Sequence, residues 1–279
     1  MKKSLLVAVL AASMVMLAAC GKTEENVAEA PETEAVATVE DTEADVAEVE
    51  VETEVEAEAE AEEKGEGVMS FDDYMAAAVD TEVTVETYVQ AANSWWDGKI
   101  TVYSADQDGA YFLYDMACSE EDAAKLVPGT KIKVNGFKSE WSGEIEIIDG
   151  TFEFEDGDTY VAPVQDVTEF FGQPELADYM NQKFSVTGAV VEASTDADGN
   201  EADWLYNWDG SGEEGNDVYF NVNINGESYA FLVRAYLTGP DTDVYKAAKE
   251  LKVGDTIDCE GFLYWYNGAN PHITSITVK

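Results

Sequence analysis

The segment 127-VPGTKIKVNGF-137 recurs near the C-terminus as 252-KVGDTIDCEGF-262. In both copies a glycine suited to a turn precedes a run with apolar residues at alternate positions, and a second glycine and a phenylalanine follow. Alternation of this kind is typical of a β-strand with one buried face. Each copy continues through a glycine-bearing turn into a last strand, expected over residues 144–148 and 272–278. The repeat predicts two β-domains of similar fold.

The repeat extends toward the N-terminus in both copies. The tripeptide Asp73-Tyr74-Met75 reappears as Asp178-Tyr179-Met180, and an alternating strand follows each. Short polar turns then join two strands as a hairpin, and a short helix leads into the fourth strand. The first copy is expected to hold strands over residues 83–89, 100–104 and 111–116 and a helix after Ser119; the second, strands over 184–190, 218–224 and 229–235 and a helix over 244–251.

Five strands with a helix between the third and fourth is the order of the OB-fold, a small Greek-key barrel. Both copies resemble that family, including the spacing of glycines and apolar residues around the fourth strand. We therefore predict a mainly β protein with two tandem five-stranded OB-like barrels, each with a short helix between strands three and four. A different five- or six-stranded barrel, or a small sandwich, is the alternative.

The N-terminal residues have the features of a secretion signal. Lys2 and Lys3 precede a short apolar run, which ends in Leu17-Ala18-Ala19-Cys20. This ending resembles the lipobox of bacterial lipoproteins, and the resemblance implies that Cys20 is lipidated and becomes the mature N-terminus. An uncleaved transmembrane anchor is the alternative, but the run falls short of the roughly 20 residues that a spanning helix needs. We expect a protein attached by lipid to the extracytoplasmic face of the cell membrane.

Residues 21–67 differ sharply in composition from the rest of the chain. Up to Glu66, nineteen acidic residues are opposed only by Lys22 and Lys64. Such a segment buries too little apolar area to offset the entropy of ordering it. We predict a disordered acidic linker, with a Glu/Ala-rich helix as the alternative. The expected divisions are a signal peptide over 1–20, the linker over 21–67, and OB-like domains over 68–168 and 169–279. The whole arrangement resembles bacterial lipoproteins that carry tandem OB-like domains behind an acidic spacer.

The formal net charge is -44, from 59 acidic against 15 basic residues. A nucleic-acid partner is normally announced by a basic patch, so the charge predicts no nucleic-acid binding. The charge is compatible with neutral and cationic ligands. Alternatively, its only role is to keep the protein soluble.

Aromatic residues gather in the loops that hold ligands in the OB family, between strands one and two and between strands four and five. The predicted ligand-binding residues are Trp95, Trp96, Trp141, Trp204, Trp208, Tyr264, Trp265 and Tyr266. Their flat faces and polar edges suit stacking. We predict a binding module for a neutral or cationic ligand, such as a glycan or cell-wall fragment. Alternatively the rings close the barrel ends or join the two domains, and the protein is a structural lipoprotein that docks onto another envelope protein.

Little in the sequence indicates catalysis, and we expect neither an enzyme nor a cofactor. His272 is the single histidine, and no nucleophile, metalloprotease or phosphate-loop motif occurs. The turns at Ser104–Gly109 and Ser194–Gly199 imitate the first half of a calcium loop but lack its closing glutamate, so no metal site is predicted and calcium is the alternative. Cys118 and Cys259 fall in different repeats, so we expect no disulfide between them.

Overall fold

The computed structural model describes residues 64–279. The predicted signal peptide, Cys20 and nearly all of the predicted linker lie outside the described residues. Both barrels belong to one compact unit that ends at Lys279. Within residues 64–279, no helix is both long enough and apolar enough to cross a membrane.

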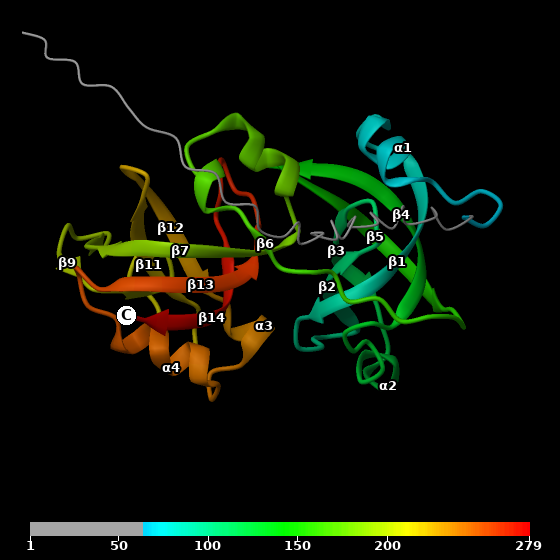
Figure 1. Ribbon diagram of the computed structural model, residues 1–279. Coiled ribbons are helices and arrows are strands. Elements are labelled where there is room, and N and C mark those ends of the chain that lie inside the picture. The colour runs from blue at the N-terminus through cyan, green and yellow to red at the C-terminus, as the bar shows by residue number, and fades with distance from the viewer. Residues whose placement is uncertain (1–63) are drawn as a thin grey trace, which may run out of the picture. The chain divides into compact units, whose positions relative to one another are not determined.

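The first barrel closes through five strands in the order β1-β2-β3-β5-β4 (Figure 1). Its elements are α1 Phe71–Ala76, β1 Glu82–Ala92, β2 Lys99–Ala105, β3 Ala110–Ala117, α2 Glu120–Ala123, β4 Lys131–Trp141 and β5 Glu144–Phe154. Strands β3 and β5 pair in parallel, while the other neighbours are antiparallel. The alternating apolar positions fill the interior, where Val85, Val102, Leu113, Ile132 and Ile147 are fully buried.

The second barrel repeats this arrangement with β7, β11, β12, β14 and β13, and β7 closes it by pairing with both β13 and β11. Its elements are β6 Gln165–Asp166, η1 Thr168–Phe170, η2 Pro174–Tyr179, β7 Lys183–Glu192, β8 Ser194–Thr195, β9 Glu201–Ala202, β10 Leu205–Tyr206, β11 Val218–Ile224, β12 Glu227–Val233, α3 Ala235–Thr238, α4 Asp243–Glu250, β13 Thr256–Phe262 and β14 His272–Val278. The predicted fold class is confirmed, with α2 and α4 as the helices between the third and fourth barrel strands.

Most of the expected strands differ from the observed ones by one to three residues at an end, and two differences change how an element runs. Strand β5 continues to Phe154 instead of ending at Ile148, because Asp149 adopts a positive φ of 52° and the chain passes a bulge rather than a turn. Ala235 does not end a strand but begins α3. An Asp-Gly pair reads as a turn signal in sequence, and here it serves a bulge.

A buried lysine fixes the helix that precedes the first barrel. Lys138 on β4 is 4% exposed, and its Nζ donates to the carbonyl oxygens of Tyr74, Met75 and Ala77 at 3.0, 2.7 and 2.8 Å. These carbonyls lie at the C-terminal end of α1, where the last carbonyl oxygens of a helix lack partners within it; the Tyr74 oxygen also accepts from the Ala77 N–H. Burial lowers the pKa of Lys138. The ammonium thus replaces water as the partner of the helix end.

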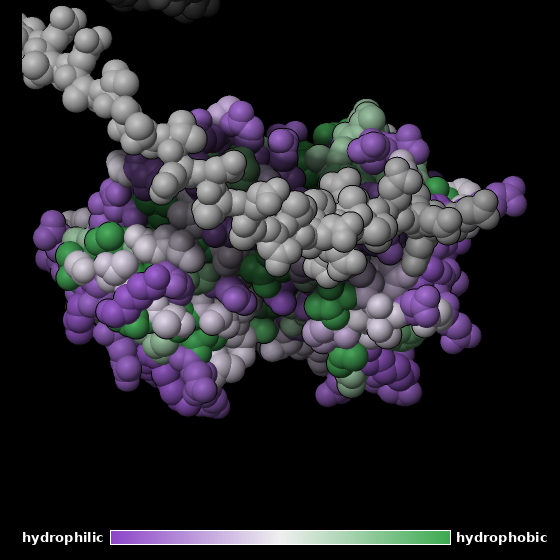
Figure 2. Space-filling view, viewed as in Figure 1, coloured by the Kyte–Doolittle hydropathy of each residue, from purple (hydrophilic) through white to green (hydrophobic). Residues whose placement is uncertain are grey.

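The two barrels share a small apolar cluster. It contains Tyr103 and Phe112 of the first barrel and Phe262 of the second. The Tyr103 and Phe262 rings stack, with centroids 4.3 Å apart and planes at 12°. The Tyr103 hydroxyl also forms a hydrogen bond with Nδ1 of His272, at 2.6 Å. On the face drawn in space-filling form, hydrophilic residues gather over α2 and α4 (Figure 2).

A buried carboxyl group joins the closing turns of the two barrels. Glu144, at the start of β5, is fully buried and accepts hydrogen bonds from Asn181 Nδ2 and, at 2.8 Å, from the backbone N–H of Trp265. The backbone N–H of Asn267 donates to the backbone carbonyl oxygen of Ser142 at 2.7 Å. The loop between β13 and β14 is therefore fixed by the β4–β5 turn.

Candidate functional site

A cleft lies on the face of the second barrel where OB-folds hold their ligands. We call it the aromatic cleft. Its volume is about 670 Å³. It is lined by Trp141, Ser194, Thr195, Leu205, Trp208, Tyr219, Asn221, Ala230, Arg234, Tyr264, Tyr266, Asn267, Gly268, Ala269, Asn270 and His272. Strands β11 and β12 supply the floor of the cleft. The β7–β11 and β13–β14 connections supply its walls, and the first barrel supplies Trp141.

Three rings stand at the edge of the aromatic cleft with much of their surface free. Trp141 is 59% exposed, Trp208 is 74% exposed and Tyr266 is 50% exposed. Trp141 ends β4 of the first barrel. Trp208 lies in the β10–β11 loop of the second barrel, and Tyr266 lies in its β13–β14 loop. Exposed rings on fixed backbone can stack on a flat ligand without first leaving a packed core.

The Tyr264 ring is held in place by a buried histidine. Its ring stacks on His272, with centroids 4.4 Å apart and planes at 19°. Burial and the nearby Arg234 lower the pKa of His272 well below its ordinary value, so the imidazole is neutral. The hydrogen bond with Tyr103 fixes the orientation of that imidazole. His272 thus supports a ring of the cleft from a buried position at the start of β14.

Other predicted residues have structural surroundings. Trp265 points toward the first barrel, where a Cβ built on Gly143 would lie 3.0 Å from its indole. Trp204 packs on the core of the second barrel and meets Tyr206 edge-on. Trp95 donates from Nε1 to the Cys118 carbonyl at 2.9 Å. These three indoles correspond to the structural alternative that the sequence left open.

Trp96 lies in a second cleft, of about 250 Å³. That cleft is lined by Asn93, Ser94, Trp96, Lys99, Ile100, Thr101, Tyr114, Asp115, Arg234 and Tyr236. It occupies the corresponding face of the first barrel, along β2 and β3. The structure therefore divides the predicted residues among two clefts and the packed parts of the barrels.

Arg234 is the residue that sequence reasoning missed. It is the only arginine in the sequence, and it directly follows β12, one of the two strands that form the floor of the aromatic cleft. Its Nε atom is buried without a hydrogen-bond partner among the described residues. No carboxylate in residues 64–279 forms an ion pair with it. In so acidic a chain, the presence of a single arginine was the signal that the sequence offered.

The aromatic cleft is free of carboxylates. None of the described residues that line it is an aspartate or a glutamate. The cleft therefore combines five aromatic rings, one guanidinium and several amide side chains. Such a surface can stack on a flat ring and pair with an anionic group attached to it.

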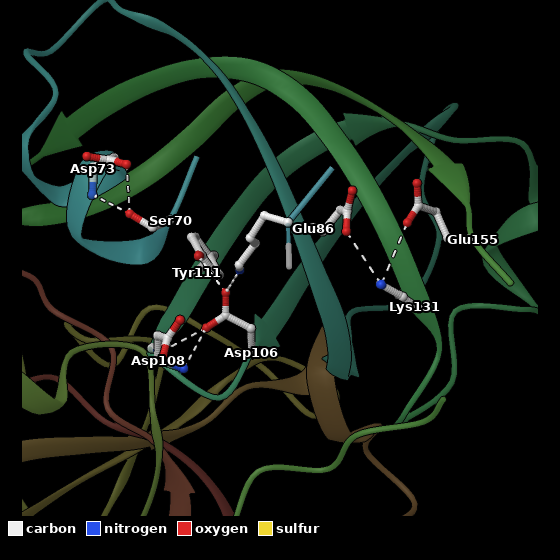
Figure 3. A network of polar contacts seen from close by, with 10 residues as sticks. Ser70, Asp73, Glu86, Asp106, Asp108, Tyr111, Lys131 and Glu155 are labelled. Carbon is white, nitrogen blue, oxygen red and sulfur yellow. Dashed lines mark hydrogen bonds and ion pairs between the residues drawn. The ribbon is translucent and has the colours of Figure 1, made fainter. Parts of the chain in front are cut away.

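The aspartate turns that imitate calcium loops have protein partners instead. Asp106 accepts from the backbone N–H groups of Asp108 and Gly109, from the Tyr111 hydroxyl and from Lys64 (Figure 3). Asp196 likewise accepts from backbone N–H groups of its own turn. In the part of the chain that the structure describes, no three His, Cys, Asp or Glu side chains are grouped so that they could hold a metal ion.

Cys118 and Cys259 lie in separate barrel interiors as buried, free thiols. Burial raises the pKa of Cys118, and it raises the pKa of Cys259 to about 12. Thiols of this kind are poor nucleophiles at neutral pH.

No protein-family model matches the chain, and neither does any curated protein. Solved structures are similar at low identity. One is a murine DNA-binding protein bound with double-stranded DNA, at a TM-score of 0.32 and 13% identity, covering 70% of this chain and 94% of that one. Another is the Ifi202 HINa domain in complex with double-stranded DNA, at 0.30 and 13%, covering 72% and 96%. A third is a replication protein A heterotrimer bound to single-stranded DNA, at 0.26 and 8%, covering 76% and 69%.

Two sequence-based predictions are wrong in the light of these similarities: the glycan-binding or envelope-docking role, and the exclusion of nucleic acid as a partner. The similar structures named above are complexes with DNA. The physical reason for the second error is that the net charge of -44 describes the whole chain. The aromatic cleft itself carries one cation and, among the described residues that line it, no carboxylate.

Proposed function

We propose that the protein is a binding module without catalytic activity and that its aromatic cleft binds the bases of single-stranded nucleic acid. The observation that carries the proposal is the combination of five aromatic rings with the only arginine on a carboxylate-free surface. Single strands are held by stacking of bases on aromatic side chains next to groups that meet the phosphates. The cleft offers both features.

The size and exposure of the rings support this proposal. A base has two flat faces, and Trp208, Trp141 and Tyr266 expose half or more of their surface beside the cleft. Amide side chains on the same surface, such as Asn221 and Asn270, can donate to and accept from base edges. A double helix keeps its bases stacked on each other, so a single strand fits this chemistry better.

The test is a titration of the full chain with tetrathymidylate, followed by quenching of tryptophan fluorescence. We expect saturable quenching in the wild type. Trp208→Ala is expected to weaken binding by roughly 5- to 100-fold, because stacking on one base is worth about 1–3 kcal/mol. The matched control is Phe137→Ala, which removes a ring of 41% exposure on β4 that lines neither cleft. Absence of binding by the wild type, or equal weakening by both variants, would refute the proposal.

We also propose that Cys20 is lipidated and holds the protein on the extracytoplasmic face of the cell membrane. The support is the lipobox-like ending Leu17-Ala18-Ala19-Cys20 after a basic start and an apolar run. Metabolic labelling with a palmitate analogue is expected to mark the wild type and to leave Cys20→Ser unlabelled. Equal labelling of the two proteins would contradict the assignment.

A further inference from the structure

Two clefts meet at one side chain. Arg234 lines both the aromatic cleft and the second cleft. The second cleft offers rings of its own, since Trp96 is 71% exposed and Tyr236 is 54% exposed. The guanidinium therefore lies between two groups of exposed aromatic rings, one on each barrel.

The backbone around Arg234 is held by several contacts. The N–H of Ala235 donates to Asp217 Oδ1 at 2.7 Å, and the Arg234 carbonyl oxygen accepts from Leu237 and Thr238 as α3 begins. The backbone N–H of Ser94, in the β1–β2 loop of the first barrel, donates to the backbone carbonyl oxygen of Tyr236 at 2.6 Å. These bonds fix the arginine where the two clefts join.

The charge pattern around Arg234 favours an anionic partner at this junction. The one acidic residue of the second cleft, Asp115, is already engaged by Lys99 at 3.4 Å and by the Thr101 hydroxyl at 3.3 Å. The buried Nε of Arg234 has no partner within residues 64–279. A guanidinium presents a fork of N–H donors that matches the oxygens of a phosphate.

We infer that one nucleic-acid single strand spans both clefts, with bases on the rings of each barrel and an internucleotide phosphate against Arg234. The inference rests on the proposed function and adds three features to it. The strand covers both barrels, and the binding unit is longer than one nucleotide. Arg234 binds the phosphate that links the two stacked bases.

The experiment compares thymidylate with tetrathymidylate on the full chain, by fluorescence and by calorimetry. Tetrathymidylate is expected to bind at least about tenfold more tightly, because a second stacking site is added. Trp208→Ala is expected to weaken both ligands. Trp96→Ala is expected to weaken tetrathymidylate by about fivefold or more and to leave thymidylate unchanged. Because the Trp96 indole is mostly exposed, this variant should keep the wild-type circular dichroism spectrum.

A neutral linkage tests the role of Arg234. A tetrathymidylate with uncharged methylphosphonate linkages should bind the wild type more weakly, and Arg234→Gln should lose a similar factor with the natural ligand. Combining the two changes is expected to cost little more than either alone, since both remove the same contact. Arg234→Lys keeps the charge without the fork and should fall between wild type and Arg234→Gln.

The outcomes separate the two proposals. Equal affinity for thymidylate and tetrathymidylate, with no effect of Trp96→Ala, overturns the spanning strand and leaves the aromatic cleft as a single base site. If Arg234→Gln and the neutral linkage together reduced the affinity by the product of their separate effects, the assigned phosphate contact would be overturned. If neither ligand binds the wild type, the proposed function itself fails.

Discussion

Replacing Glu144 with glutamine is expected to remove the larger share of the decline in the protein's stability between about pH 5 and pH 8. Burial raises the pKa of Glu144 from 4.5 to about 8, although hydrogen bonds from Asn181 and Trp265 act in the opposite direction. The folded protein therefore retains a proton in this range that the unfolded chain has released. Stability falls as pH rises wherever the folded state binds more protons, so the contribution of Glu144 is fully present below about pH 4.5 and is lost as the pH rises through about 8.

The size of this effect follows from the displacement of the pKa. At about 1.4 kcal/mol for each pKa unit, Glu144 accounts for roughly 5 kcal/mol between the two ends of the range. Burial also raises the pKa of Glu146, to about 7, which adds roughly 3 kcal/mol in the same direction. Glutamine imitates the protonated acid. Its oxygen can accept from Trp265, and once the Asn181 amide turns over, its NH2 group can donate to the Asn181 Oδ1, which is buried without a partner among the described residues.

The assay is urea denaturation of the full chain at about pH 5 and pH 8, followed by circular dichroism. The wild type is expected to lose several kcal/mol of unfolding free energy across this range, and Glu144→Gln only the share that belongs to Glu146. The matched control is Glu153→Gln, an exposed carboxylate on the same strand, which should follow the wild type. An unchanged pH dependence in Glu144→Gln would refute the assignment of a buried proton to this carboxyl.

Three further outcomes are expected. The logarithm of affinity for tetrathymidylate should fall with the logarithm of salt concentration at a slope no steeper than about −0.7, since one arginine meets one phosphate; a slope near −2 would show further cationic contacts. Lys138→Met should lower the unfolding free energy by about 3 kcal/mol in urea, because the carbonyl oxygens of Met75 and Ala77 lose their donor. Lys133→Met, on the same strand, should change it by about 0.5 kcal/mol or less, and equal losses would contradict the buried role of Lys138. Gly261→Ala places a Cβ 2.2 Å from the His272 oxygen, so it should prevent folding or lower the thermal midpoint by about 10 °C or more; a wild-type midpoint would contradict this close approach.

The architecture could be predicted because its signals are local and repeated. Alternating apolar residues and two copies of one pattern indicated strands close to those found, and the bounds of β11 and β14 match. The continuation of β5 beyond Ile148 could not be predicted, because Asp149-Gly150 has the composition of a turn. Whether such a pair turns the chain or bulges it depends on the partner strand, and the sequence of one strand does not contain that information.

The candidate site was predictable only in part. The positions of the aromatic loops follow from strand order, but the direction of each ring does not. Tyr264 and Tyr266 line the aromatic cleft, whereas Trp265 between them packs toward Gly143. Arg234 was overlooked because the charge was summed over the chain. A sum conceals a surface on which the few cationic groups are placed away from the many acidic ones.

Trp141 comes from the first barrel and lines the cleft of the second, whereas Arg234 and Tyr236 come from the second barrel and line the cleft of the first. Each copy of the duplicated unit has therefore given a side chain to its neighbour's surface. Such copies are no longer interchangeable modules. A barrel excised or grafted elsewhere would carry an incomplete surface, and a chain with the two halves in reverse order would present different side chains at both sites.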